Sequence, residues 1–362
     1  MKALGRLVTI ISLALTLVTG SVALTVTAIA AGDGGGGGES GDDGDASSGA
    51  SGGGGAASAK RNPDYTAARK HIEEGRYATA IPLPRKIVAA DPINANAHNY
   101  LGYSYRKLKR LDATLDHYTR ALTIKPDHRG ANEYLGGLHL ESGWLTLAEE
   151  RLAKLADICS DCEQYHDLRQ LVADYKAANY LKNVDFTFGE TVKLGKSRPR
   201  DSTQGERRAS TVIQRKGSVV FMVESIDWPH AERQVFHVNS NLYRGTNAIV
   251  RYDNGQATNF HVLFDSKAFA SVVATYEGRL GPPTDRLERP VAAPGAAKRT
   301  NSILIWHSVD PGTGRITKLE VRNFDDARSG FPDTGHGVIM LHHERSLPIF
   351  PNLSSLDLMM LQ

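Results

Sequence analysis

The chain has 362 residues, enough for two domains with further segments beside them. Its hydrophobic content of 41% and charged content of 23% are those of a globular protein, and a formal net charge of +3 is too small to imply a nucleic-acid partner. The charge is unevenly spread. Residues 33–60 hold five acidic residues and one lysine, whereas residues 193–216 hold eight basic residues against two acidic ones.

Residues 1–31 have the layout of an export signal. Lys2 and Arg6 precede an uncharged run, residues 7–31, and Ala28 and Ala30 form an A-x-A cleavage site. We therefore expect an exported, periplasmic bacterial protein. The uncharged run also exceeds the roughly 20 residues that a membrane span needs. An uncleaved inner-membrane anchor that faces the periplasm is the alternative interpretation.

Residues 32–60 form a low-complexity segment of Gly, Ser, Ala and Asp. Such a segment buries too little apolar surface to offset the entropy lost on ordering, so we expect a disordered linker. Asp42, Asp43 and Asp45 match the spacing of neither an EF-hand loop nor a nonapeptide calcium repeat. No metal site is therefore predicted in the linker.

A repeat of 34 residues runs through residues 61–180. The clearest correspondences are Tyr100-Leu101-Gly102 with Tyr134-Leu135-Gly136, Ala97 with Ala131, and Pro92 with Pro126. A fixed period of this length marks stacked helical hairpins, because one hairpin cannot bury its apolar face alone. Gly102 and Gly136 are expected where the two helices of one hairpin approach closely. Pro82 and Pro84 fall inside the first repeat, so we expect its second helix to start late or to kink there.

These residues resemble the tetratricopeptide repeat (TPR) family. In the best repeat, which starts at Ala95, the matching residues are Leu101, Gly102, Tyr105, Tyr118, Ala121 and Pro126. The resemblance implies a concave face, lined by the first helix of each hairpin, that binds an extended peptide or protein segment. The residues expected on this face are Tyr65, Arg69, Asn99, Tyr103, Arg106, Lys107, Glu133 and Glu141. Asn, Tyr and Arg suit contacts with a peptide, although a merely solvated helix face is the alternative.

The chain has two cysteines, Cys159 and Cys162. An even count in an exported chain predicts a disulfide, which would join the end of the third hairpin to a further helix that starts near Glu163. A redox dithiol is the alternative, but no strand-helix-strand pattern of a thioredoxin surrounds the pair. A zinc site would need two more ligands, of which His166 supplies at most one.

From about residue 181 the hydrophobic period changes from helical to two-fold. Strands are expected at residues 184–194, 211–226, 235–242, 248–252, 258–264, 302–309, 315–321 and 338–342, and helices at 266–277 and 353–361. Asp253-Asn254-Gly255 predicts a tight hairpin turn. We therefore expect a multidomain chain, in which an all-α TPR-like helical hairpin array precedes an antiparallel, β-rich α+β domain at residues 181–362.

The carboxy-terminal domain shows none of the common catalytic or phosphate-binding motifs. No catalytic residue and no cofactor is therefore predicted, and we do not expect an enzyme. His342 and His343 are adjacent in a strand and point to opposite faces, which makes them poor metal ligands, so no metal site is predicted. The basic residues 193–216 form either a solvated loop or a surface for anionic lipid or acidic protein.

The export signal, the repeat and the lack of catalytic motifs predict an exported scaffold or adaptor for protein–protein interaction in the cell envelope. The expected partner is a protein or peptide in the TPR groove and not a nucleic acid, with residues 7–31 as a membrane tether if the signal is not cleaved. The alternative is a ligand-binding protein or an enzyme whose site lies in the carboxy-terminal domain.

Overall fold

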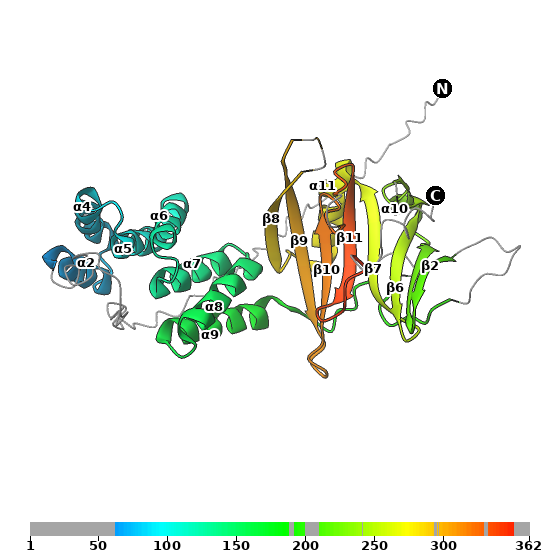
Figure 1. Ribbon diagram of the computed structural model, residues 1–362, viewed down its shortest axis with the longest axis horizontal. Coiled ribbons are helices and arrows are strands. Elements are labelled where there is room, and N and C mark those ends of the chain that lie inside the picture. The colour runs from blue at the N-terminus through cyan, green and yellow to red at the C-terminus, as the bar shows by residue number, and fades with distance from the viewer. Residues whose placement is uncertain are drawn as a thin grey trace, which may run out of the picture. The chain divides into compact units, whose positions relative to one another are not determined.

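The structure consists of a helical part followed along the chain by a sheet-rich part (Figure 1). It is a computed structural model and describes residues 62–187, 192–199, 210–240, 242–292, 295, 297–328 and 332–350. The expectations for residues 1–31, for the linker at 32–60 and for a helix at 353–361 lie outside the described residues. Within the described part of the chain, no helix is both long and apolar enough to cross a membrane.

The described helical part contains eight helices. They are α2 (Pro63–Glu73), α3 (Tyr77–Ala80), α4 (Pro82–Ala90), α5 (Ala95–Lys107), α6 (Leu111–Ile124), α7 (Arg129–Glu141), α8 (Leu145–Cys159) and α9 (Glu163–Asn179). Side chains at the boundaries explain where α5 and α7 begin. Asn94 accepts a hydrogen bond from the backbone N–H of Ala97, and His128 accepts one from Ala131. The expected array of helical hairpins is confirmed.

Two repeat glycines lie where helices touch. A Cβ atom on Gly102 of α5 would stand 2.5 Å from Cδ1 of Tyr118 on α6, and one on Gly136 of α7 would stand 2.5 Å from Cδ2 of Leu168 on α9. Both distances are too short for a real contact, so a Cβ atom at either position would force the neighbouring side chain to shift. The close approach predicted within one hairpin is confirmed for Gly102, whereas Gly136 faces α9 and not α8, the second helix of its own hairpin.

The first repeat is distorted at the predicted place. Its second helix is divided at Ile81, with α3 before that residue and α4 beginning at Pro82. Proline is tolerated in the first helical turn, because the N–H groups of that turn have no acceptor within the helix. The prediction of a late or kinked helix is therefore confirmed.

The cysteine pair lies between the last two helices. Cys159 ends α8 and Cys162 is the N-cap residue of α9, with Cα atoms 5.5 Å apart and the sulfur atoms at disulfide distance. This arrangement agrees with the predicted disulfide between the end of one helix and the start of the next.

The described strands form one large sheet and a small two-stranded one. The strands are β1 (Leu181–Lys182), β2 (Ser210–Lys216), β3 (Val219–Ser225), β4 (Val238–Asn239), β5 (Arg244–Gly245), β6 (Asn247–Asp253), β7 (Gln256–Asp265), β8 (Asp285–Val291), β9 (Arg299–Val309), β10 (Ile316–Arg322) and β11 (His336–His343). The large sheet has the order β1-β9-β10-β11-β7-β6-β3-β2, with β8 also paired to β9. Its pairings are antiparallel except that of β1 with β9.

Three strand predictions were wrong. Residues 184–187 lie outside strands, because the chain pairs with β9 earlier, through β1. The range 211–226 is two strands, since Gly217 adopts a positive φ of 59° and turns the chain between β2 and β3. Among the described residues of the predicted strand 235–242, only β4 is a strand. Strand β8 was missed, because its sequence DRLERPV shows no alternation of apolar residues.

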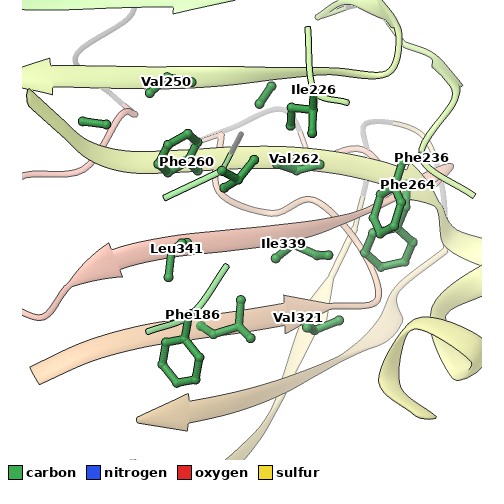
Figure 2. Packing of buried hydrophobic residues seen from close by; sticks show 14 of the residues in the cluster. Phe186, Ile226, Phe236, Val250, Phe260, Val262, Phe264, Val321, Ile339 and Leu341 are labelled. Atoms are coloured by element: carbon green, nitrogen blue, oxygen red, sulfur yellow. The ribbon is translucent and has the colours of Figure 1, made fainter. Parts of the chain in front are cut away.

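The main core of the sheet-rich part lies between one face of the sheet and helix α11 (Phe269–Leu280). Val272 and Tyr276 of α11 belong to the same buried cluster as Trp306 of β9. Figure 2 shows the sheet side of this cluster, including Val262 and Ile339. A second buried cluster lies on the opposite face and includes Phe221, Tyr243 and Leu263. Both faces of the central strands are therefore covered.

Hydrogen bonds join the third hairpin to the sheet. The buried carboxylate of Asp285 in β8 accepts bonds from the backbone N–H (3.2 Å) and the hydroxyl (2.6 Å) of Thr146 in the first turn of α8. The hydroxyl of Tyr175 in α9 donates to the carbonyl oxygen of Thr284, 3.1 Å away. The ring of Tyr180 stacks on that of His307. Helices α8 and α9 are thereby attached directly to β8 and β9.

Candidate functional site

The candidate site is the surface shared by the first helices of successive hairpins. Helix α2 contacts α5, α5 contacts α7, and α9 continues the series by packing on α7. We call this surface the first-helix face. The resemblance placed the partner-binding residues on it, and the structure shows how each of them is used.

Two tyrosines of first helices lie on this face, Tyr103 and Tyr134, and Tyr77 from the start of the second helix of the first hairpin lies beside Tyr103. The ring of Tyr103 on α5 is 6.3 Å from that of Tyr77 on α3 and 4.9 Å from that of Tyr134 on α7, measured between centroids. The ammonium group of Lys107 lies 5.5 Å from the centre of the Tyr103 ring, a cation–π arrangement. Sequence reasoning identified Tyr103 and Lys107 but omitted Tyr77 and Tyr134. The repetition of Tyr100 at position 134 was a signal for the latter.

Arg106 is used within the protein. Its Nη2 atom lies 2.9 Å from Oε1 of Glu141, and its Nη1 donates to the carbonyl oxygen of Tyr134 at 3.4 Å. Only 12% of the side chain is exposed. The ion pair of Arg106 and Glu141 therefore links α5 to α7, whereas the sequence analysis expected both residues to bind a partner.

Asn99, Arg69 and Tyr65 have mainly local roles. Asn99 is 7% exposed, and its Oδ1 atom has no hydrogen-bond partner among the residues described. Arg69 bonds Glu73 one turn along α2, through Nε and Oε1 at 2.7 Å. The hydroxyl of the buried Tyr65 donates to Asn94, the residue that caps α5. The structure therefore buries Asn99 and Tyr65, and Arg69 is the exposed member of the three.

Glu133 lies among other carboxylates. Burial, together with the negative charges of Asp167 and Glu163 on α9, raises the pKa of the half-buried Glu133 to about 8, and the charge of Arg106 offsets this only in part. Across the described residues, the side chains of these three acids make no hydrogen bond or ion pair with a basic group. Glu133 is thus the predicted site residue whose electrostatic environment is most unusual.

The sheet-rich part offers less support for a reaction site. Among the described residues, no group of three His, Cys, Asp or Glu side chains could hold a metal ion. His342 interacts with Glu320, whereas His343 faces Thr317, so the two rings point to opposite sides of β11 as expected. The alternative of an enzyme or ligand-binding site in this domain stays a prediction.

Comparison with known proteins identifies one hairpin of the helical part. Residues 95–128, which comprise α5 and α6, match the model of the tetratricopeptide repeat family. This segment is a tetratricopeptide repeat. The resemblance inferred from the sequence is confirmed, with the TPR lying in the hairpin that carries Tyr103. No curated protein matches the chain.

Solved TPR domains are similar to about a third of the chain. The first TPR of Spaghetti (RPAP3), bound to the HSP90 peptide SRMEEVD, is 18% identical, with 31% of this chain and 90% of that chain covered and a TM-score of 0.28. The second TPR domain of human RPAP3, in complex with the HSP70 peptide SGPTIEEVD, is 19% identical, with coverage of 30% and 91% and a TM-score of 0.28. The first TPR domain of human RPAP3 is 17% identical, with coverage of 32% and 94% and the same TM-score of 0.28.

The TPR assignment defines a general activity. Arrays of helical repeats present extended surfaces for contacts with other proteins, and the TPR family is generally non-enzymatic. The matched repeat accordingly supports a role of the helical part in protein–protein interaction. The assignment does not extend to the sheet-rich part, for which the absence of enzymatic activity stays a prediction.

Proposed function

We propose that the chain is an exported bacterial scaffold that binds a partner protein in the cell envelope. The first-helix face holds an extended segment of the partner, and the sheet-rich domain, attached to α8 and α9, holds a second site on the same partner or another protein. Export rests on the signal-like residues 1–31.

The row of Tyr77, Tyr103 and Tyr134 is the observation that carries the peptide-binding part of the proposal. Tyr103 and Tyr134 lie on α5 and α7, which are first helices of their hairpins, and Tyr77 of α3 extends the row from the neighbouring second helix. Tyrosine is enriched at binding hot spots, because it combines a large apolar ring with a hydroxyl that can bond a peptide backbone. A Cβ atom on Gly137 would stand 2.8 Å from Nη2 of Arg106, so the glycine leaves room for this guanidinium beside α7.

Site-specific photocrosslinking in the native host tests this proposal. A photoreactive phenylalanine analogue at position 103 should give discrete adducts with a partner. The same analogue at Leu115, an exposed position on α6, serves as the matched control and should not. Identical adducts from both positions, or none from position 103, would overturn binding at the first-helix face.

A reporter fusion tests export separately. Alkaline phosphatase, which is active only after export, is joined after residue 60 and compared with a fusion that lacks residues 1–31. Activity of the first fusion alone supports export. Equal, low activity of both would refute it and leave the binding proposal intact.

A further inference from the structure

The disulfide between Cys159 and Cys162 lies in an exposed turn between α8 and α9. Both cysteines are partly exposed, and the two residues between them, Ser160 and Asp161, are exposed. The bond joins the last residue of one helix to the N-cap residue of the next. A thiol of another molecule can therefore reach the sulfur atoms from solution.

The turn keeps its shape without the disulfide. The backbone N–H of Cys162 donates to the carbonyl oxygen of Cys159 at 2.9 Å. Leu155 of α8 and Leu168 of α9 are fully buried in one hydrophobic cluster, which fixes the two helices against each other. Reduction therefore leaves the two thiols side by side, so that the disulfide can form again as a fast intramolecular reaction.

The two sulfur atoms have different surroundings. Cys162 is the N-cap residue of α9, a helix of 17 residues, and its side chain makes no capping hydrogen bond within the described structure. The first N–H groups of a helix have no acceptor inside it, and they form its positive end. A thiolate at Cys162 can accept hydrogen bonds from them and is thereby stabilised. Cys159, in contrast, packs against the cluster of Leu155 and Leu168, which shields its sulfur.

Two carboxylates beside the turn act against a thiolate. The side chain of Asp161 is 96% exposed, and its Oδ1 atom lies 2.8 Å from Nε2 of His166. Glu163 is exposed as well. Water and salt screen exposed charges, whereas the N–H groups at the start of α9 can bond a thiolate directly. The start of α9 therefore outweighs the two carboxylates.

We propose that Cys159 and Cys162 exchange their disulfide with a pair of cysteine thiols on another protein, with Cys162 as the attacked sulfur. This activity goes beyond the proposed scaffold role and does not depend on the first-helix face. A thioredoxin fold is not required for it, because the chemistry needs only a reachable sulfur whose thiolate is stabilised and a second thiol beside it.

The exchange is balanced in atoms and electrons. A thiolate of the other protein attacks the Sγ atom of Cys162, the bond to Cys159 breaks, and the Cys159 sulfur takes a proton from water. The second thiol of the other protein then loses its proton and attacks the mixed disulfide at that protein's own sulfur. Cys162 leaves as a thiolate at the start of α9 and is protonated in turn. The other protein loses two electrons and two protons and the cysteine pair gains them, so no further oxidant is needed.

Equilibration of the full chain with mixtures of reduced and oxidised glutathione is the first test. Free thiols are alkylated with a maleimide of large mass and counted by gel electrophoresis. The pair should open and close reversibly as the ratio changes, while the helical circular dichroism signal persists. A disulfide that only stabilises a fold resists reduction by glutathione. A pair that stays closed in a large excess of reduced glutathione would overturn the proposal.

Single-cysteine variants test the roles of the two sulfur atoms. Cys159→Ser leaves Cys162 as the one cysteine of the chain, and Cys162→Ser leaves Cys159. Cys159→Ser should form a mixed disulfide with oxidised glutathione about threefold faster or more, because its larger thiolate fraction outweighs the lower nucleophilicity of a stabilised thiolate. In urea the two variants should react equally, which is the control. Equal rates in the folded proteins would contradict Cys162 as the attacked sulfur.

Trapping in the native host tests the protein substrate. Cys159→Ser lacks the thiol that resolves a mixed disulfide, so it should accumulate adducts that appear on a non-reducing gel and disappear on reduction. Cys162→Ser is the matched control and should accumulate far fewer. No adducts, or the same adducts from both variants, would refute exchange with another protein. A failure of photocrosslinking at position 103 leaves these outcomes unchanged, so the two proposals can fail separately.

Discussion

Asp285 caps a helix that lies 139 residues earlier in the chain. Trp144, the N-cap residue of α8, offers no side-chain cap, and the Asp285 carboxylate takes that place by accepting bonds from the N–H and the hydroxyl of Thr146. It also accepts the backbone N–H of Arg286 at 2.9 Å. The side chain is 1% exposed, so water cannot replace these bonds. Replacing Asp285 by Ala should therefore destabilise the protein.

The expected loss follows from the bonds removed. A helix cap contributes about 1 kcal/mol, and a hydrogen bond to a charged group about 1.5–3 kcal/mol. The cost of burying the carboxylate, which raises the pKa of Asp285, offsets part of this gain. We expect Asp285→Ala to lower the free energy of unfolding by about 2–3 kcal/mol. Asp285→Asn, which keeps one acceptor oxygen, should lose less.

Urea denaturation measures this loss. Far-UV circular dichroism follows the helices, and tryptophan fluorescence follows Trp144 at α8 together with the buried Trp228 and Trp306 of the sheet-rich part. Asp265→Ala removes a cap from an exposed turn and serves as the control, with a much smaller expected shift. An Asp285→Ala midpoint equal to that of the wild type would refute the cross-chain cap.

Three further predictions concern packing, pH and oxidation. Gly102→Ala should lower the free energy of unfolding, measured by thermal denaturation, by about 1–3 kcal/mol, because its Cβ would collide with Tyr118. Gly278→Ala in α11, where a Cβ would have nothing within 4 Å, should be stabilising. Equal effects of the two changes would contradict the close helix contact at Gly102. Burial lowers the pKa of His307 from 6.5 to about 3. The contribution of the neutral imidazole to the free energy of unfolding is therefore fully present above about pH 6.5 and decreases as the pH falls toward 3. Between pH 7 and pH 4.5 the wild type should lose up to about 2–3 kcal/mol that His307→Gln does not lose. Reduction of the Cys159–Cys162 disulfide should lower the free energy of unfolding by about 2 kcal/mol, because the unfolded chain then regains the entropy lost in closing this short loop. Rapid thiol labelling before reduction would show that the disulfide does not form.

The repeat was predictable from the sequence because the interactions that shape it are local. A glycine at a helix contact and a proline that breaks a helix act on neighbours within one hairpin, so the positions of Gly102 and Pro82 in the repeat suffice to predict the contact with α6 and the break at Ile81. The site was only partly predictable. Arg106 looks like a free cation until α7 places Glu141 opposite it, 35 residues later.

The parts that the sequence did not reveal depend on distant pairings. Strand β8 has Pro290 and charged residues where an alternating strand would have apolar ones, and it exists because β9 supplies partners for its backbone. The charge of Asp285 likewise has no local explanation, since its partner Thr146 lies in the helical part. An isolated Asp in a polar segment is ordinarily a surface residue.

The same cap bears on binding, because it supports α8, on which α9, the last helix of the first-helix face, packs. Helix α9, which carries Asp167 and Glu163, packs on α8 and is bonded to the sheet through Tyr175. In water, Asp285→Ala should bind a peptide selected on the wild type as tightly as the wild type does. A fraction of native protein close to one leaves the apparent affinity unchanged. As urea is added, the variant should lose affinity at a lower concentration, because its binding-competent population falls first. If binding to both proteins declined at the same urea concentration, the sheet would not be holding the face in its binding conformation.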